Sequence, residues 1–383
     1  IVSVGATSNT FGIKGVRDHC QFLKQIEDAA SLRKAIAYCF ERASVPSLSI
    51  EEQKSALSFI VVGAGPTGVE FTAELRDFME TEGRRYYPDL LKYVRITLVE
   101  ASGAVLQMLD ETLQREALKK LLERKTKLIS AGYINQEMVR VLLNVGVSEV
   151  KDSSVLLNSG EEINYGFCVW AAGNGPVPLV LEMIQKIPQQ QEMQSKARGR
   201  LVTDSWLRVE GVEGIYSFGD CSYIDGDPLP ATAQVASQQG AYLGRLFSRG
   251  YSMTGLAPTR LLTNNTAPSV LSQIEPVSFA TDRTRLGTIG LPVEGEESEA
   301  TSVEVAKPFQ FLNLGVLAYI GASEALAEIA VDKQAVLGSG PIGFFLWRGI
   351  YWSKQVSWRN RVLVTFDWIK GRLFGRDIGA LYL

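Results

Sequence analysis

The chain has 383 residues, 46% of them hydrophobic and 21% charged, which is typical of a globular protein of two or three domains. Its four cysteines are too few and too scattered for a disulfide scaffold, and its single histidine, His19, argues against histidine metal sites and a Ser-His-Asp hydrolase. We interpret His19 as structural. No run of about 18 apolar residues is present, so the sequence predicts no helix that spans a bilayer.

The net charge of −3 is unevenly distributed along the chain. Residues 341–383 contain seven Lys and Arg against two Asp, whereas acidic residues are in excess over the remainder. A basic segment on an acidic body favours an anionic surface as its partner.

The first residues, Ile-Val-Ser-Val-Gly, predict a buried strand that turns into small polar residues by Asn9. Because chains seldom begin inside a core strand, we expect further sequence upstream of Ile1. Residues 167–174, Phe-Cys-Val-Trp-Ala-Ala-Gly-Asn, show a similar pattern, which indicates two nucleotide-binding halves built alike. Residues 24–42 carry apolar residues at helical spacing and predict a helix, and residues 47–58 a connecting segment.

A glycine-rich turn follows the apolar residues 59–62, which predict a strand buried on both faces of a parallel sheet. The turn has Gly63, Gly65 and Gly68 in the order G-x-G-x-x-G, and an amphipathic helix comes next. In such a turn the glycines permit the bend, the close approach of a pyrophosphate and the packing of helix on strand. The alternative is a purely structural turn, and the strand and helix on either side favour dinucleotide binding.

A second strand at residues 94–99 ends in Glu100. A carboxylate at this place accepts hydrogen bonds from the adenosine ribose and repels a 2′-phosphate, so NADH is favoured over NADPH. Glu100 lies 32 residues after Gly68 rather than the usual 20 or so, and we attribute the excess to a longer helix and the segment Tyr-Tyr-Pro-Asp at residues 86–89.

The rest of the chain predicts further elements of both kinds. They are a helix at 110–123, an inserted loop at 126–138, a β-meander at 146–162 with a turn at 158–160, an exposed glutamine-rich stretch at 185–194, strands at 201–209 and 215–220, a helix at 232–243 and a long irregular insertion at 248–306. Gly219-Asp220 ends a predicted strand and could bind a cofactor sugar or be an ordinary turn. Gln234 and Gln238 share one helix face, which could line a ligand site or face solvent.

The C-terminal segment holds four of the six tryptophans, interleaved with apolar and basic residues: Trp347, Trp352, Trp358 and Trp368. Such a segment is typical of amphipathic helices that lie in the headgroup plane of a membrane. The alternative is a helix packed on the protein's own core or at a dimer interface, and the interfacial tryptophans favour the membrane.

Taken in order, these motifs resemble the type II (alternative, single-subunit) NADH:quinone oxidoreductases. The resemblance covers the chain apart from about 126–138 and 248–306, and rests on the segments beginning at Val4, Gly63, Val169, Phe218, Ala231 and Gly315 together with the aromatic, basic C-terminus. It implies an α/β flavoprotein with two Rossmann-like dinucleotide-binding domains of the disulfide-reductase type and C-terminal amphipathic membrane-anchoring helices. The family's first glycine fingerprint for the FAD diphosphate would precede Ile1 and is absent from this sequence.

The resemblance also implies roles for individual residues. Gly63, Gly65, Thr67 and Gly68 would hold the NADH pyrophosphate, Glu100 its ribose, and Ala172 and Gly173 would line the same cleft near Glu70. Ala6, Thr7, Gly219 and Asp220 would contact FAD. Gln234 and Gln238 would lie between flavin and quinone. We therefore predict Glu70, Gln234 and Gln238 as catalytic residues. Glu70 would handle a proton or a charge near the nicotinamide, and the alternative is that it only caps or orients its helix.

The implied domains are FAD-binding at 1–48 and 199–247, NADH-binding at 56–178, the insertion at 248–306 and a membrane-association region at 307–383. The predicted reaction carries electrons from NADH through FAD to a membrane quinone such as ubiquinone, without proton pumping, in a peripheral protein of the respiratory chain at the mitochondrial inner membrane. Two rivals stay open: a catalytically dead, membrane-associated NADH-binding protein, and a sulfide:quinone or disulfide reductase, although no C-x-x-C pair is present. Whether the protein is a monomer or a homodimer also stays open.

Overall fold

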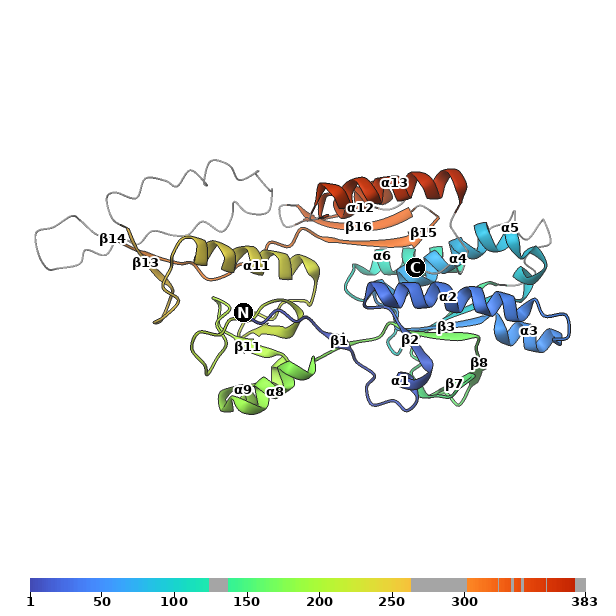
Figure 1. The fold of residues 1–383 in the computed structure, drawn as a ribbon, viewed down its shortest axis with the longest axis horizontal. Coiled ribbons are helices and arrows are strands. Elements are labelled where there is room, and N and C mark those ends of the chain that lie inside the picture. The colour runs from blue at the N-terminus through green and yellow to red at the C-terminus, as the bar shows by residue number, and fades with distance from the viewer. Residues whose placement is uncertain are drawn as a thin grey trace, which may run out of the picture. The chain divides into compact units, whose positions relative to one another are not determined.

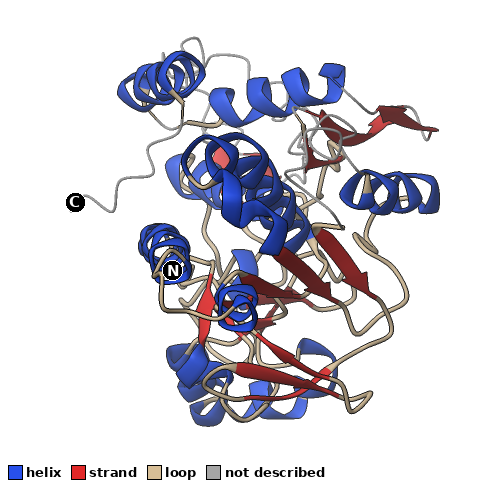
Figure 2. Ribbon diagram, turned by 90° about the vertical axis from the view of Figure 1, so that its right-hand side faces the viewer, coloured by secondary structure: helices blue, strands red, loops and turns tan. Residues whose placement is uncertain are grey.

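The computed structural model describes residues 1–123, 137–262, 302–322, 324–331, 334–338, 341–355 and 357–375. Its chain forms two compact units: the first comprises Ile1–Thr7 and Asn174–Asn313, and the second Ser8–Gly173 and Leu314–Leu383. Both units mix helices and strands (Figure 1, Figure 2), which confirms the α/β class. The predicted loop at 126–138 and the insertion at 248–306 lie mostly outside the described residues.

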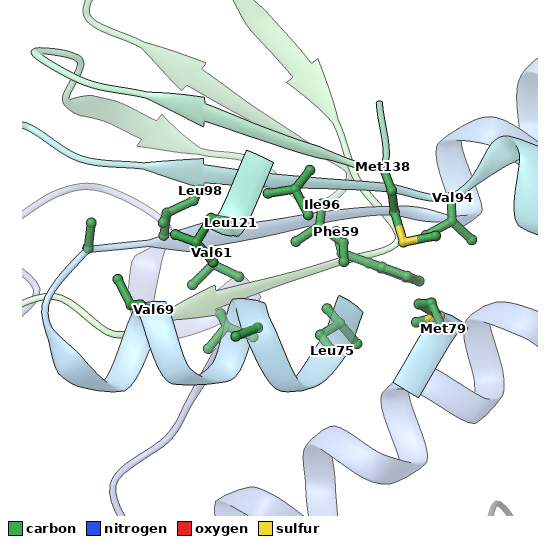
Figure 3. Packing of buried hydrophobic residues seen from close by; sticks show 14 of the residues in the cluster. Phe59, Val61, Val69, Leu75, Met79, Val94, Ile96, Leu98, Leu121 and Met138 are labelled. Carbon is green, nitrogen blue, oxygen red and sulfur yellow. The ribbon is translucent and has the colours of Figure 1, made fainter. Parts of the chain in front are cut away.

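A parallel sheet of five strands is the centre of the second unit. Its order is β2 (Cys20–Phe22), β9 (Phe167–Trp170), β3 (Ser58–Val62), β4 (Arg95–Val99) and β5 (Val139–Leu142). The predicted strands at 59–62 and 94–99 are thus confirmed, and β3 is buried over its last four residues. Val69 and Leu75 pack beneath Phe59 and Val61 in this core (Figure 3).

The helices of the second unit before the C-terminal segment are α1 (Val16–His19), α2 (Ile26–Ala43), α3 (Ile50–Ala56), α4 (Pro66–Phe78), α5 (Arg84–Tyr86) and α6 (Glu111–Leu122). Those predicted at 24–42, 110–123 and after Gly68 are confirmed. The prediction of a connecting segment at 47–58 was wrong, because α3 lies within it. The signal was present in the sequence: Ser49 and Glu52 form a capping box, each side chain bonding the other's main-chain N–H.

The long excursion between α4 and Glu100 has a regular structure. The helix continues through a π-helical turn, η1 (Met79–Gly83), into α5, and a 3₁₀ helix, η2 (Pro88–Tyr93), leads to β4. This accounts for the unusual spacing in the way that the sequence predicted.

Two antiparallel sheets complete the second unit. The predicted β-meander is confirmed as β6 (Val147–Val150), β7 (Ser154–Leu157) and β8 (Glu162–Asn164), with Gly160 in the left-handed region at φ 86°. Near the C-terminus, β15 (Val316–Gly321), β16 (Glu324–Val331) and β17 (Gln334–Gly338) form the other sheet. On β15 and β16 lies α12 (Pro341–Ser353), followed by α13 (Trp358–Phe374) (Figure 1).

The first unit contains shorter elements: α8 (Pro178–Lys186), α9 (Pro188–Glu192), α10 (Gln194–Ala197), β11 (Leu201–Thr203), a 3₁₀ turn η3 (Gly219–Cys221), β12 (Ser222–Ile224), α11 (Ala233–Ser248), β13 (Thr259–Leu262) and β14 (Ser302–Val305). The strands β11 and β12 pair in parallel, and β13 and β14 antiparallel. The predicted helix at 232–243 is confirmed as α11. The two-residue strands β1 (Thr7–Ser8) and β10 (Asn174–Gly175) lie where the chain passes between the units.

Three predictions for the first unit were wrong in extent. Residues 1–5 are not a buried strand: only Val2 forms a bridge, to Ser217, and Ile1 remains 68% exposed. The strand at 201–209 ends at Thr203, because the Asp204 carboxylate accepts the main-chain N–H groups of residues 206 and 208 and turns the chain. Residues 215–220 form single bridges and then η3 rather than a buried strand.

The stretch at 185–194, predicted to be exposed, has Gln185, Gln189 and Gln191 at the surface, but it also contains one buried glutamine. Gln190 is fully buried, and its side-chain amide donates to the carbonyl oxygens of Val202 and Glu210 and accepts from the Val202 N–H. A buried amide is tolerated when all its groups are paired, so Gln190 ties α9 to β11.

Residues 8–48, predicted as part of the FAD-binding domain, are grouped with the second unit, because β2 pairs with β9.

Candidate functional site

The glycine turn between β3 and α4 is built around two close approaches and one open position. Gly63 has φ 100°, and a Cβ there would lie 2.9 Å from the main chain of Ala172. A Cβ on Gly68 would overlap the carbonyl oxygen of Gly63, whereas one on Gly65 would meet nothing within 4 Å. The structure therefore needs glycine at 63 and 68 for packing, and leaves open space at Gly65.

The open space lies at a helix N-terminus. Gly65 is the N-cap of α4, and Pro66 occupies its first position, where no N–H is needed. The first-turn N–H groups of a helix lack intrahelical partners and, with the helix dipole, favour an anion. Backbone near Gly65, Thr67 and Gly68 therefore fits a pyrophosphate.

Glu100 is held beside this turn by three hydrogen bonds. Its Oε2 accepts the main-chain N–H of Ala64 at 2.6 Å, and its Oε1 accepts the N–H and the hydroxyl of Ser102 at 2.9 and 2.7 Å. A carboxylate offers about four lone-pair positions, so acceptor capacity remains for ribose hydroxyls. Ser102, which the sequence reasoning missed, is two residues beyond the strand end and fixes the rotamer of Glu100.

Ala172 and Gly173 follow β9, the strand next to β3. Ala172 packs on Gly63, and Gly173 has φ 70° with a Cβ position that would press on the Phe11 ring. Both predicted cleft residues therefore lie at the carboxyl edge of the sheet, where parallel α/β sheets bind ligands.

Glu70 lies one turn into α4 and contacts the C-terminal segment of the same unit. Its Oε1 accepts the main-chain N–H of Tyr319 in β15 at 3.1 Å. Burial raises the pKa of Glu70 above its ordinary value, while the hydrogen bond from the Tyr319 N–H opposes that rise. A carboxyl group with a raised pKa close to the glycine turn is suited to proton handling.

In the first unit, two extended segments run parallel and bring the predicted FAD residues to the same end. The N–H of Val2 donates to Tyr216 O at 2.7 Å, and the N–H of Phe218 donates to Val2 O at 3.2 Å. Ala6 and Thr7 follow the one segment, and Gly219 and Asp220 follow the other. Gly5 has φ 69° with nothing within 4 Å of its Cβ position, so the backbone there is open.

Helix α11 holds this end through a residue that the sequence reasoning missed. The N–H of Gly219 donates to Gln239 Oε1 at 2.8 Å, and Gln239 is buried. Its neighbour Gln238 bonds the main chain of Leu312 in both directions, at 2.8 and 2.9 Å, and Gln234 is partly buried one turn before. The signal for Gln239 was its place after Gln238, but sequence cannot tell which of two adjacent amides faces the core.

Two of the four cysteines lie side by side in the parallel sheet of the second unit. All four are free thiols and buried. Cys20 and Cys168 pair across β2 and β9 with sulfurs 3.5 Å apart, and the hydrogen bond with Cys20 and burial raise the pKa of Cys168 well above its ordinary value. Buried thiols with raised pKa values are poor nucleophiles. The described residues also contain no cluster of three or more His, Cys, Asp or Glu placed to hold a metal ion.

Helix α13 carries a stripe of exposed apolar residues: Trp358, Val362, Phe366, Ile369 and Leu373, between 51% and 70% exposed. The spacing of three and four residues places them on one face. Arg361 lies over the rings of Trp352 and Trp358, while Arg359, Lys370 and Arg372 are exposed. Among the described helices, none combines the length and the hydropathy that crossing a membrane requires.

Helix α12 differs from α13, because part of its aromatic surface faces the chain's own core. Phe344 and Trp347 pack on Tyr319 with ring centroids 5.8 and 5.6 Å away, and both border the large core cluster of the second unit. For these two residues the packed-helix alternative is therefore confirmed.

The chain is similar to known proteins in sequence and in fold. The family profile described as pyridine nucleotide-disulphide oxidoreductase matches residues 1–240, and that of the NDH2 C-terminal domain matches residues 313–377. A protein of Yarrowia lipolytica named external alternative NADH-ubiquinone oxidoreductase, mitochondrial, is 36% identical over 99% of this chain and 62% of its own length. A Schizosaccharomyces pombe protein named probable NADH-ubiquinone oxidoreductase, mitochondrial, is 35% identical over all of this chain and 64% of its own.

The chain thus spans less than two thirds of the length of these two relatives. Among solved structures, that of NDH2 from Plasmodium falciparum in complex with NADH matches with a TM-score of 0.74 and 22% identity, over 98% of this chain and 78% of the other. This likeness supports the fold.

Proposed function

This chain belongs to the type II NADH:quinone oxidoreductases of the pyridine nucleotide-disulphide oxidoreductase family, and we propose that it carries electrons from NADH to a membrane quinone without pumping protons. The observation that carries the proposal is the open glycine turn at the N-terminus of α4 with the Glu100 carboxylate bonded to Ala64 beside it. This arrangement suits the diphosphate and ribose of NADH.

The residues of the first unit suit a flavin dinucleotide. The open backbone at Gly5, with Ala6 and Thr7, offers main-chain groups without side-chain obstruction, and Asp220, next to Gly219, supplies an acceptor for hydroxyl groups. A bound FAD would supply two-electron chemistry with the nicotinamide and the quinone. The chain's own residues bind and orient: Gln239 holds the main chain at Gly219, and Gln238 fixes the segment around Leu312.

We expect Gln238→Leu to slow quinone reduction about tenfold while a soluble acceptor is reduced at a nearly unchanged rate, because the two bonds to Leu312, about 1 kcal/mol each, shape the acceptor side. Gln190→Leu is the matched control, since Gln190 also bonds a main-chain N–H and carbonyl in the same unit. Steady-state rates with both acceptors measure the effect. Equal slowing with both acceptors would remove Gln238 from the quinone side.

We expect Glu100→Gln to reduce the preference for NADH over NADPH by about tenfold, about 1.4 kcal/mol, because the variant no longer repels a 2′-phosphate. The amide oxygen can still accept the Ala64 N–H, while the amide NH2 group replaces the oxygen that accepted from Ser102, so it loses the bond from the Ser102 N–H and can donate to the Ser102 hydroxyl. The ratio of kcat/KM for the two nucleotides is the measurement, and Glu161→Gln, at an exposed carboxylate that pairs with Arg140, is the control. An unchanged ratio would contradict the ribose role.

The exposed stripe of α13 and its basic residues support binding to the anionic surface of a membrane in whose bilayer the quinone is dissolved. The names of the relatives, which include the word mitochondrial, support a peripheral location at a mitochondrial membrane. We further propose the inner membrane and ubiquinone.

The proposal is tested by adding NADH and a short-chain ubiquinone to the purified protein and following the loss of NADH absorbance. Activity together with the yellow absorbance of bound flavin supports it. A folded, colourless protein that binds NADH without turnover would support the dead binder instead. A disulfide reductase needs a reactive cysteine, whereas Cys20 and Cys168 are buried and the pKa of Cys168 is raised. Reduction of a disulfide substrate by NADH would favour that rival.

A further inference from the structure

Tyr319 of β15 is bonded to α4 at two points. Its main-chain N–H donates to Glu70 Oε1 at 3.1 Å, and its hydroxyl donates to Asp77 Oδ2 at 2.7 Å. Glu70 and Asp77 are seven residues apart, two turns of helix, so they lie on the same face of α4. One tyrosine thus spans the two carboxylates of the helix that begins at the glycine turn.

The strand is fixed around this tyrosine. Asp77 Oδ2 also accepts the N–H of Ala322 at 2.6 Å, and the Arg76 guanidinium donates to Ile320 O at 3.5 Å. Gly321 makes the approach feasible, because a Cβ there would lie 2.5 Å from Arg76 Nη2. Tyr319 itself is 5% exposed. The hydroxyl bond to Asp77 therefore fixes a buried ring, and with it the position of the Tyr319 N–H.

Aromatic residues of α12 lie near Glu70 and Tyr319. The Trp347 ring lies 5.6 Å from that of Tyr319 and 4.8 Å from that of Tyr351, both centroid to centroid. The titratable groups that face Glu70 in the described residues are Glu74 of its own helix, which raises its pKa, and Tyr351 of α12, whose own pKa is raised by burial and by Glu70. No cation faces Glu70 among these groups. The Tyr319 N–H is the bonded donor that opposes the effect of burial.

We propose that Tyr319 is a positioning residue for Glu70: anchored through its hydroxyl to Asp77, it holds its main-chain N–H against the Glu70 carboxylate and so keeps that group in place beside the NADH turn. The inference rests on the proposed function, because it assumes that Glu70 handles a proton or charge during turnover. It adds a residue of the C-terminal sheet to the machinery of the nucleotide-binding helix.

The first measurement needs no catalysis. Because the folded-state pKa of Glu70 is raised, the stability that Glu70 contributes is fully present below its unfolded-state pKa and is lost as the pH rises through its folded-state pKa. The difference in Tm between the protein and its Glu70→Gln variant, followed against pH, reports that folded-state pKa. The same difference is then measured in the Tyr319→Phe background.

We expect the pH at which this difference changes to rise by about half a unit or more in the Tyr319→Phe background, because a less firmly held N–H favours the charged carboxylate less. Tyr165→Phe is the matched control: its hydroxyl is also buried and donates to a main-chain carbonyl, that of Lys151, at 2.6 Å in the same unit. It should lower Tm without moving the midpoint for Glu70.

The second measurement is the pH dependence of the quinone reductase rate. The decrease in this rate toward low pH should be absent in Glu70→Gln. In Tyr319→Phe the midpoint of the decrease should move to higher pH. If the midpoint for Glu70 does not move in Tyr319→Phe in either measurement, Tyr319 does not position Glu70. If Tyr165→Phe moves the midpoint by the same amount, the effect of Tyr319 is that of general packing. If the protein reduces no quinone at all, the proposed function fails, while the Tm series still decides whether Tyr319 positions Glu70.

Discussion

Replacing Gly68 by alanine should destabilise the second unit by about 3 kcal/mol or more and abolish NADH binding, because the added Cβ would overlap the carbonyl oxygen of Gly63. The carbonyl oxygen belongs to the main chain and the position of a Cβ is fixed by the main chain, so the clash cannot be relieved by a side-chain rotation. Helix α4 must move away from β3, and the packing of Val69 against Val61 is lost with it (Figure 3). Thermal unfolding and a nucleotide titration measure the two effects.

The neighbouring Gly65 separates packing from binding. It has φ −71°, which alanine adopts freely, and its Cβ position meets nothing within 4 Å. Gly65→Ala should therefore keep the Tm of the parent protein and lose NADH affinity by about tenfold or more, since the methyl group enters the space of the pyrophosphate. A Gly65→Ala protein that binds NADH normally would contradict the placement of the diphosphate, whatever Gly68→Ala does.

Most of the helices, strands and turns that were predicted correctly follow from patterns among neighbouring residues. The strand at 59–62, the glycine turn and α4 follow from apolar runs and φ requirements that a few neighbouring residues impose. The meander turn at Gly160 is of the same kind. The capping box of Ser49 and Glu52 is an equally local pattern, and it predicts the start of α3, which the sequence analysis did not include.

Contacts between distant segments could not be predicted in this way. The bond from Tyr319 to Asp77 joins residues 242 positions apart, and a tyrosine in an alternating strand gives no sign of its partner. Gln239 and Gln190 are similar: an amide in a polar stretch looks solvated until another segment supplies the main-chain groups that it bonds. Conversely, the apolar composition of residues 1–5 predicts a core strand, but within the described structure the segment forms a single β-bridge, from Val2 to Ser217. Composition alone therefore does not predict whether a partner strand is present.

The exposed stripe of α13 should control membrane binding. Phe366 and Leu373 are 66% and 70% exposed, so Phe366→Glu with Leu373→Glu should change folding stability little. Burying two such side chains in a bilayer is worth about 3 to 6 kcal/mol, so binding to vesicles that contain anionic lipid should fall at least about a hundredfold. These substitutions are cleaner than removing residues 347–383, because Trp347 packs on Tyr319 and its loss would disturb the core.

The measurement is cosedimentation with vesicles of phosphatidylcholine and phosphatidylserine, with NADH oxidation by a soluble acceptor as a check on the fold. Ile26→Glu with Leu256→Glu is the control, because both residues are exposed, at 80% and 97%, and the same charge is added at residues that are not part of α13. Binding should weaken with added salt, since exposed Lys370 and Arg372 attract the anionic headgroups. A variant that still sediments like the parent protein would exclude the stripe as the anchor, and a variant that instead changes from dimer to monomer in solution would assign it to contact between copies of the chain.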